Sequence, residues 1–187
     1  MNKNYRIVDD ALPNPHEVKE FLKSLTYFTT EDYNMNGVVY GDNSQRPGGF
    51  WRGFRSVNLY DTDRDNTALM LKLLLKKAFA VDCEFSKAEA YSHFTTGSMH
   101  KKIPPTSRWH PDNVDCAGVL YLNENPPKHS GTFINLNRGI VEVENKFNRL
   151  VLYDGYLHHA PGVFFGDDVN DARHTYSIFI NDLVLQK

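Results

Sequence analysis

Two short segments of the sequence carry side chains that could bind one metal ion. His110 and Asp112 are separated by a single proline, and in an extended segment residues i and i+2 point to the same side of the backbone. The pair His158 and His159 follows a later apolar stretch that predicts a strand. Two imidazoles and one carboxylate leave one side of a metal ion open, an arrangement typical of non-haem iron(II) centres that react with oxygen.

A single arginine near the end of the sequence supplies a candidate anion site. Arg173 begins the last apolar stretch, and a guanidinium can bind a carboxylate through two parallel hydrogen bonds while keeping its charge when buried. Thr175 would share its face of a strand and could add a hydroxyl to the same carboxylate. Each motif is common alone. The specific feature is their order: H-x-D, a turn with Gly131, a strand ending in histidine, then arginine.

The first part of the chain is expected to be helical. A short strand is expected at Arg6–Asp9, and Asn14-Pro15 predicts a helix start, with a capping side chain before a proline in the first helical position. The apolar stripe of this helix consists of Val18, Phe21, Leu22 and Leu25. A second helix is expected over 66–80. It is apolar on more than one face, which predicts broad packing against a sheet.

The second part of the chain is expected to be rich in strands. The polar, glycine-rich segment 34–53 is expected to be mostly loop. Strands are expected at 84–94, 117–123, 132–136, 139–143, 149–153, 162–165 and 175–182. This pattern predicts a β-sandwich or jelly roll with two helices packed against it. We expect one domain over 1–187, with helical support over about 1–83 and the β core over about 84–187.

Composition limits the possible partners and location. The 187 residues carry a net charge of −2, which gives no general attraction for nucleic acid or an anionic membrane. No stretch approaches the roughly 20 apolar residues of a membrane span, and the opening residues do not read as a secretory signal. Cys83 and Cys116 are therefore expected to be reduced core residues. A cytoplasmic location follows as an expectation.

With these motifs in view, the chain resembles the 2-oxoglutarate/iron(II) dioxygenase superfamily, especially its prolyl-hydroxylase-like branch and related phage and bacterial sequences. Residues 6–15 look like its opening strand and helix start, and 91–112 like the strand leading into H-x-D. Residues 119–123 and 130–133 look like the strand and turn that follow it, and 149–173 like the segment with the distal histidine and the arginine. The resemblance implies a mainly β fold with flanking helices, a double-stranded β-helix of jelly-roll, cupin-like form. It also implies Fe(II) and 2-oxoglutarate as cofactors.

The implied activity is that of an enzyme, a hydroxylase acting with O2. It would hydroxylate a protein side chain such as proline, or a small molecule, and release succinate and CO2. A phage or bacterial source is implied, with the protein in the bacterial or host cytoplasm. Nucleic acid is disfavoured as a substrate, because relatives that act on it usually carry a second arginine later in the last strand, and none follows Arg173.

The resemblance also implies roles for individual residues. His110, Asp112 and His159 would bind the metal. His159 is preferred because Ala160-Pro161 follows it, with His158 as the alternative. Arg173 would bind 2-oxoglutarate, although residues 165–171 lengthen its usual spacing from the histidine. Some relatives have a tyrosine where Leu120 stands, so the second contact to 2-oxoglutarate is assigned to Tyr91 or Thr175.

Other polar residues near these motifs have simpler interpretations. His93, His100 and His129 lack ligand spacing and are expected on the surface or in loops. Asn113 would either orient a ligand by hydrogen bonding or cap a turn. The arginines and aromatic residues of segment 51–55 would either line a substrate entrance or cover the edge of the barrel.

Two other classes of function fit part of the pattern. A cupin-like zinc hydrolase or isomerase would also use two histidines and a carboxylate, but it has no need for Arg173. A non-catalytic binding protein could keep the fold, although a site that is out of use tends to lose a ligand, and all are present here. The sequence leaves the substrate and the oligomeric state open.

Overall fold

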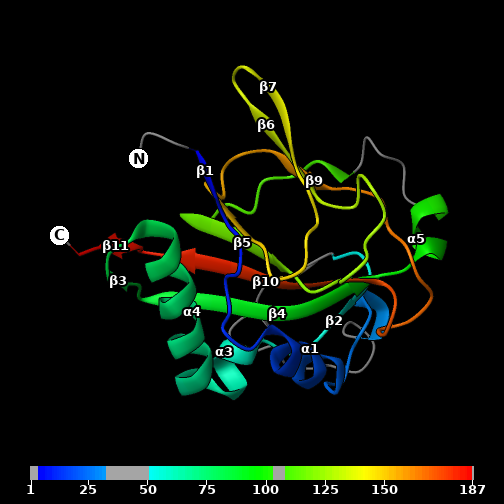
Figure 1. The fold of residues 1–187 in the computed structure, drawn as a ribbon, viewed down its shortest axis with the longest axis horizontal. Coiled ribbons are helices and arrows are strands. Elements are labelled where there is room, and N and C mark those ends of the chain that lie inside the picture. Colours follow the sequence, from blue (N-terminus) through cyan, green and yellow to red (C-terminus); the bar gives the residue numbers. More distant parts are fainter. Residues whose placement is uncertain (1–3, 33–50, 103–107, 187) are drawn as a thin grey trace.

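The protein folds into two facing antiparallel sheets with helices covering the larger one (Figure 1). The computed structural model describes residues 4–32, 51–102 and 108–186, so most of the expected loop at 34–53 lies outside the described residues. Helices α1, α3 and α4 lie together on one side of the larger sheet, and the β6–β7 hairpin projects from the other side (Figure 1). No helix in the described part of the chain is long and apolar enough to cross a membrane.

The larger sheet combines strands from both parts of the sequence. In spatial order it contains β1 (Tyr5–Val8), β8 (Leu150–Tyr153), β5 (Cys116–Tyr121), β10 (Arg173–Asn181), β4 (Lys87–Thr95) and β2 (Phe54–Arg55). All neighbouring pairs are antiparallel. The first part of the chain therefore provides both edge strands of this sheet as well as helices.

The smaller sheet faces the larger one and contains the distal histidine. Its order is β7 (Gly139–Val143), β6 (Thr132–Leu136) and β9 (His159–Pro161). A separate pair is formed by β3 (Cys83–Glu84) and β11 (Val184–Leu185). The two facing sheets make the expected double-stranded β-helix.

The expected strand at 162–165 is wrong, and so is the placement of a histidine at the end of the 149–153 strand. The chain turns after β8, where Leu157 N–H donates to the Asp154 carbonyl at 3.0 Å, and His159 then begins β9. Beyond β9, Gly162 N–H donates to the Gly131 carbonyl at 2.9 Å. This contact ties residue 162 to the turn before β6 instead of to a strand.

Helices with both ends among the described residues are α1 (Pro15–Lys23), α3 (Leu59–Thr62), α4 (Arg64–Phe79) and α5 (Gly97–Lys102). Buried residues of α1, α3 and α4 belong to the hydrophobic layer on the larger sheet. Asn14 occupies the N-cap position of α1, but its side chain donates to Glu17 at 2.8 Å and does not cap the backbone. Phe21, expected in the apolar stripe, is 55% exposed.

Helix α4 packs through one face only, contrary to expectation. Leu71, Leu74 and Leu75 are buried against the sheet, whereas Leu69 is 70% exposed and Leu73 39% exposed. Residues four apart lie on the same side of a helix, so the two exposed leucines form a second apolar stripe that faces away from the core.

The outer, helix-covered face of the larger sheet contains one buried histidine. His174 on β10 has its Nε2 2.7 Å from Ser92 Oγ and 3.1 Å from the Tyr27 hydroxyl. The two cysteines belong to the same hydrophobic layer and are free thiols, as expected. Burial, aided by Lys19 and Lys23 of the covering helix, lowers the pKa of His174 to about 4.

This histidine is expected to make the fold sensitive to acid. Its folded-state pKa lies below the ordinary value of 6.5, so the unfolded chain binds more protons between pH 6.5 and 4, and stability is lost as pH falls through that window. The full shift corresponds to about 3 kcal/mol. Urea unfolding at pH 7 and pH 5 should show a smaller loss for His174→Gln than for the unchanged protein. Equal losses would contradict the assignment.

Candidate metal centre

A reciprocal pair of backbone hydrogen bonds brings two candidate ligands together. His110 N–H donates to the His159 carbonyl, and His159 N–H donates to the His110 carbonyl, both at 3.0 Å. Directly opposed residues of an antiparallel pair project their side chains to the same face. The two imidazole centroids accordingly lie 4.5 Å apart. This single bridge extends the smaller sheet beyond β9.

Asp112 is positioned by the turn that follows β8. Its N–H donates to the Gly155 carbonyl at 2.8 Å, and the Asn113 N–H reaches the same oxygen at 3.1 Å. Asn113 has φ of 57°, a left-handed conformation that asparagine tolerates, so its backbone shapes the turn. A Cβ at Gly155 would lie 2.3 Å from the Val114 carbonyl oxygen, so this close approach requires glycine.

The three side chains converge on one point. Asp112 lies 3.2 Å from His159 Nε2 through Oδ2 and 3.7 Å from His110 Nε2 through Oδ1. One ligand atom from each residue lies within 4.8 Å of the other two. Cis ligands about 2.1 Å from a metal ion are about 3 Å apart, so the two distances from Asp112 are close to those expected around a shared cation.

Hydrogen bonds on the far side of each ring determine which nitrogen faces the centre. His110 Nδ1 is 2.7 Å from the Arg108 carbonyl, and His159 Nδ1 is 3.1 Å from the Leu157 carbonyl. A carbonyl can only accept, so Nδ1 carries the proton and each Nε2 presents a lone pair to the Asp112 carboxylate. Such backbone contacts commonly orient metal-binding histidines.

The burial and charges of the cluster favour binding of a cation. Asp112 Oδ2 is buried without a hydrogen-bond partner among the described residues. Burial raises the pKa of Asp112 to about 6 and lowers the pKa of His159 to about 4, so both groups disfavour the charged form when no ion is bound. The His110 side chain is 52% exposed, which leaves the cluster accessible from one side.

Arg173 lies between the sheets as a buried, unbalanced charge. Its Nε donates to the Ser130 carbonyl at 2.7 Å and its Nη2 to the Gly131 carbonyl at 3.1 Å. Burial lowers its pKa from 12.5, although a guanidinium stays protonated in proteins. No aspartate or glutamate in the described part of the chain forms an ion pair with it.

The sheet register identifies the side chains that share this space. Thr175 is paired with Tyr121 on one side and His93 on the other, so all three face inward with Arg173. The Arg173 guanidinium lies 5.8 Å from the Tyr121 ring, and the Tyr121 hydroxyl donates to Thr132 Oγ1 at 2.7 Å across the sheets.

Tyr121 was not singled out from the sequence. The alternation of β5 could have revealed it, because Leu120 pairs with Tyr176 on the helix side and leaves Tyr121 facing inward. Tyr91 also faces inward, but it pairs with Ser177, about 13 Å along the strand from the level of Arg173. Its hydroxyl donates to Glu89 at 2.9 Å.

The remaining histidines differ in position. His158 is exposed, and its carbonyl accepts from Asn135 N–H at 2.8 Å. His129 is exposed beside Glu142, as expected, while His100 lies in α5. The surface interpretation of His93 is wrong: it lies within β4, facing inward, and its Nε2 hydrogen-bonds with the Arg52 carbonyl. Burial and nearby Arg55 lower its pKa to about 3.

Segment 51–55 covers the edge of the larger sheet, where β2 pairs with β4. It also places the Arg55 guanidinium 4.5 Å from the Tyr91 ring centroid on the inner face. The positive charge of Arg55 partly offsets the rise in the pKa of Asp112. Edge covering is thus observed, and the substrate-entrance role stays a prediction.

The fold is similar to that of several solved structures. The structure matches a prolyl-4-hydroxylase from Pseudomonas putida with a TM-score of 0.53 and 14% identity, covering 95% of this chain and 92% of that one. It matches HygX from Streptomyces hygroscopicus, solved with nickel and 2-oxoglutarate bound, with a TM-score of 0.54 and 9% identity, covering 96% and 83%.

A third solved structure shows that this fold serves more than one reaction. The non-heme alpha ketoglutarate dependent epimerase SnoN, from nogalamycin biosynthesis, matches with a TM-score of 0.54 and 10% identity, covering 98% of this chain and 80% of that one. No protein-family model matches the sequence, and no curated protein sequence matches it significantly. At these identities the likeness establishes the fold and leaves the reaction to the site.

Adjacent histidines allow a matched test of the third ligand. His159→Ala removes an inward Nε2 from the cluster and should weaken metal binding by at least about 100-fold, beyond the 10–100-fold typical of losing a supporting contact. His158→Ala, one residue away and exposed, should leave metal affinity unchanged. Calorimetric titration with Ni²⁺ measures both variants. A larger loss in His158→Ala would transfer the ligand role to that residue.

Metal affinity should also depend on pH through Asp112. In the metal-free protein its carboxyl takes up a proton below about pH 6, and a metal ion must displace that proton. Affinity should therefore be steady above pH 7 and fall about tenfold per unit well below pH 6. Titrations with Ni²⁺ at pH 7.5, 6.5 and 5.5 in non-chelating buffers would show the fall. A constant affinity would contradict the raised pKa of Asp112.

Proposed function

We propose that the protein is a non-haem, Fe(II)- and 2-oxoglutarate-dependent dioxygenase. The observation that carries the proposal is Arg173, a buried guanidinium with two carbonyl partners and no carboxylate partner in the described chain. A buried charge without a counter-charge is costly. A dicarboxylate entering the space between the sheets would supply the missing partner.

Both charged centres act on one aromatic residue, Tyr153. Burial raises the pKa of its hydroxyl well above the usual value, the charge of Asp112 adds to the rise, and the charge of Arg173 opposes it. The Tyr153 ring is 4.6 Å from the His159 ring and buried. One ligand with carboxylates at both ends could therefore reach from the arginine toward the metal cluster.

Each residue has a role in this proposal. His110, Asp112 and His159 would hold Fe(II), and Arg173 would bind the distal carboxylate of 2-oxoglutarate. Thr175 is suited to support that carboxylate from the same face, and Tyr121 stands closer to Arg173 than Tyr91 does. When bound, iron and 2-oxoglutarate would supply the O2-dependent oxidation of a substrate, with succinate and CO2 as co-products.

The substrate is proposed only as a class: a protein side chain such as proline, or a small molecule. Fold analogy does not select between them. A zinc hydrolase or isomerase would use the same three ligands but leaves the buried charge of Arg173 unexplained. A binding protein without catalysis would keep iron and 2-oxoglutarate bound and produce no succinate, so turnover separates it from an enzyme.

An anaerobic titration tests the cosubstrate site. Adding 2-oxoglutarate to the Fe(II)-loaded protein should produce a weak visible charge-transfer band that neither component gives alone. Arg173→Gln should weaken 2-oxoglutarate binding by at least about 30-fold, equivalent to about 2 kcal/mol, because a buried charge pair is lost. Arg173→Lys keeps the charge but lacks the planar guanidinium, so its affinity for 2-oxoglutarate should lie between those of the unchanged protein and of Arg173→Gln.

The controls separate loss of the cosubstrate from loss of the fold. Iron affinity should stay within about threefold of normal in both Arg173 variants, since no metal ligand changes. Arg64→Gln, an exposed arginine on α4, should leave the band unchanged. An unchanged 2-oxoglutarate affinity in Arg173→Gln would move the carboxylate site elsewhere. No band with iron bound would favour the zinc alternative.

A further inference from the structure

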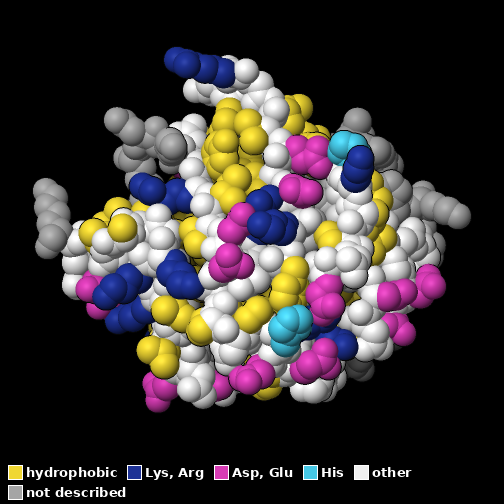
Figure 2. Space-filling view, in the orientation of Figure 1, with side chains coloured by type: hydrophobic (Ala, Val, Ile, Leu, Met, Phe, Trp, Pro, Cys, Tyr) yellow, Lys and Arg dark blue, Asp and Glu magenta, His cyan; other side chains and the backbone are white. Residues whose placement is uncertain are grey.

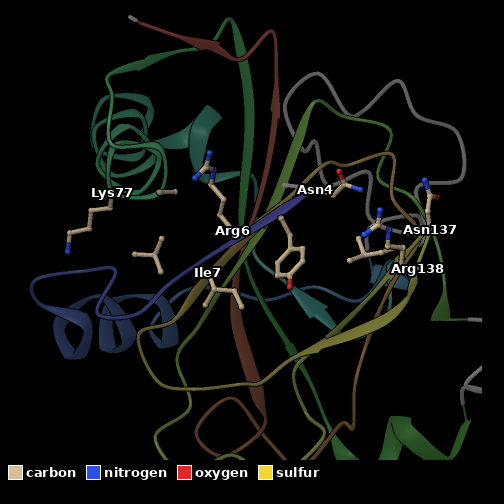
Figure 3. A pocket seen from close by; sticks show the side chains of 10 residues that line it. Asn4, Arg6, Ile7, Lys77, Asn137 and Arg138 are labelled. Carbon is tan, nitrogen blue, oxygen red and sulfur yellow. The ribbon is translucent and has the colours of Figure 1, made fainter. Parts of the chain in front are cut away.

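A groove runs along β1, the open edge of the larger sheet, on a side of the molecule that the proposed function does not use. It has a volume of about 980 Å³ and lies between the end of α4 and the tip of the β6–β7 hairpin (Figure 3). β1 pairs with β8 and with no other strand in the described structure. The open, unpaired edge of β1 therefore forms the bottom of the groove.

The hydrogen-bond pattern shows which backbone groups face the groove. Asp154 N–H donates to the Asn4 carbonyl at 3.1 Å, and bonded and non-bonded pairs alternate along an antiparallel ladder. Arg6 and Val8 thus direct their backbone groups toward β8, whereas Tyr5 and Ile7 direct theirs outward. Two N–H and two carbonyl groups are available to an added strand.

The side chains around this edge have a definite chemical character. The described residues lining the groove include three cations, Arg6, Lys77 and Arg138, and no aspartate or glutamate. Lys77 and Arg138 stand at opposite ends, and Arg6 and Ile7 project to opposite sides of β1 (Figure 3). Ile7 is 45% exposed. Figure 2 shows a basic side chain at the hairpin tip above apolar ones.

We propose that this groove binds an extended acidic peptide segment of a partner protein, which adds a strand to β1. Residues opposite one another on paired strands share a face. The added strand would thus place acidic side chains toward Arg6 and Lys77 on one face and apolar side chains toward Ile7 and Leu136 on the other. Backbone bonds give affinity in this mode, and alternate side chains give specificity.

A second copy of this chain fits the edge less well. Pairing β1 with β1 would bring Arg6 and Lys77 of one copy toward the same residues of the other, and like charges across a pair are destabilising. Exposed edges with basic residues are in general protected from such self-pairing. Charge therefore favours an acidic partner over self-association.

Fluorescence anisotropy with labelled hexapeptides tests the proposal on the whole, metal-free protein. A peptide of alternating glutamate and valine should bind, and one of alternating lysine and valine should not. N-methylation of the backbone amides on one edge of the first peptide should abolish binding, because it removes donors while keeping every charge. Binding that survives methylation of one edge and, in a second peptide, of the other edge would refute strand addition.

Charge-reversal variants locate the site. Lys77→Glu should weaken binding of the glutamate–valine peptide about tenfold at low salt. Lys76→Glu, which changes the neighbouring residue outside the groove, should leave that binding unchanged. Equal effects of the two variants, or no binding at all, would overturn the proposal. So would light scattering that shows concentration-dependent dimers blocked by Ile7→Lys. Because iron is absent throughout, these outcomes are separate from those of the cosubstrate titration.

Discussion

The reciprocal backbone hydrogen bonds between His110 and His159 are the interaction on which the candidate site depends. They join the His110 segment, which has no other strand pairing among the described residues, to the edge of the smaller sheet, and they place two imidazoles on one face with ring centroids 4.5 Å apart. The position of β9 is in turn fixed by its register with β6, where Ile134 opposes His159. The geometry of the candidate metal centre is thus determined by sheet pairing, which sets the direction of the side chains.

The site is also defined by charges that the protein does not balance internally. Asp112 and His159 face each other with lone pairs, and Arg173 is buried with carbonyl partners only. Each arrangement is unfavourable in isolation, and the cost must be offset by packing such as the buried cluster around Tyr121, Ile134 and Val151. In the proposed function, the cation would balance the lone pairs of Asp112 and His159, and the dicarboxylate would balance the buried positive charge of Arg173.

The sequence was informative where alternation and spacing act locally. The i, i+2 relation of His110 and Asp112 and most strand positions follow from period-two patterns, and the structure brings both residues together with His159. The strand containing His159 was misplaced because its start depends on pairing with β6 and on the turn at Gly155, which are contacts distant in sequence. The inward position of His93 is hidden for the same reason, since its face is set by the register with β10.

The side-chain parity of β10 explains how one strand serves two environments. Arg173 and Thr175 face the space between the sheets, while His174 and Tyr176 face the helices. A shift of one residue would exchange these sets: it would place a guanidinium among leucines and a neutral imidazole where an anion site is proposed. Both errors are costly, so the same alternation that builds the core also excludes the wrong register. The open edge of β1 has no second strand to fix its register. At that edge the positive charges of Arg6 and Lys77 restrict which segments can pair with it.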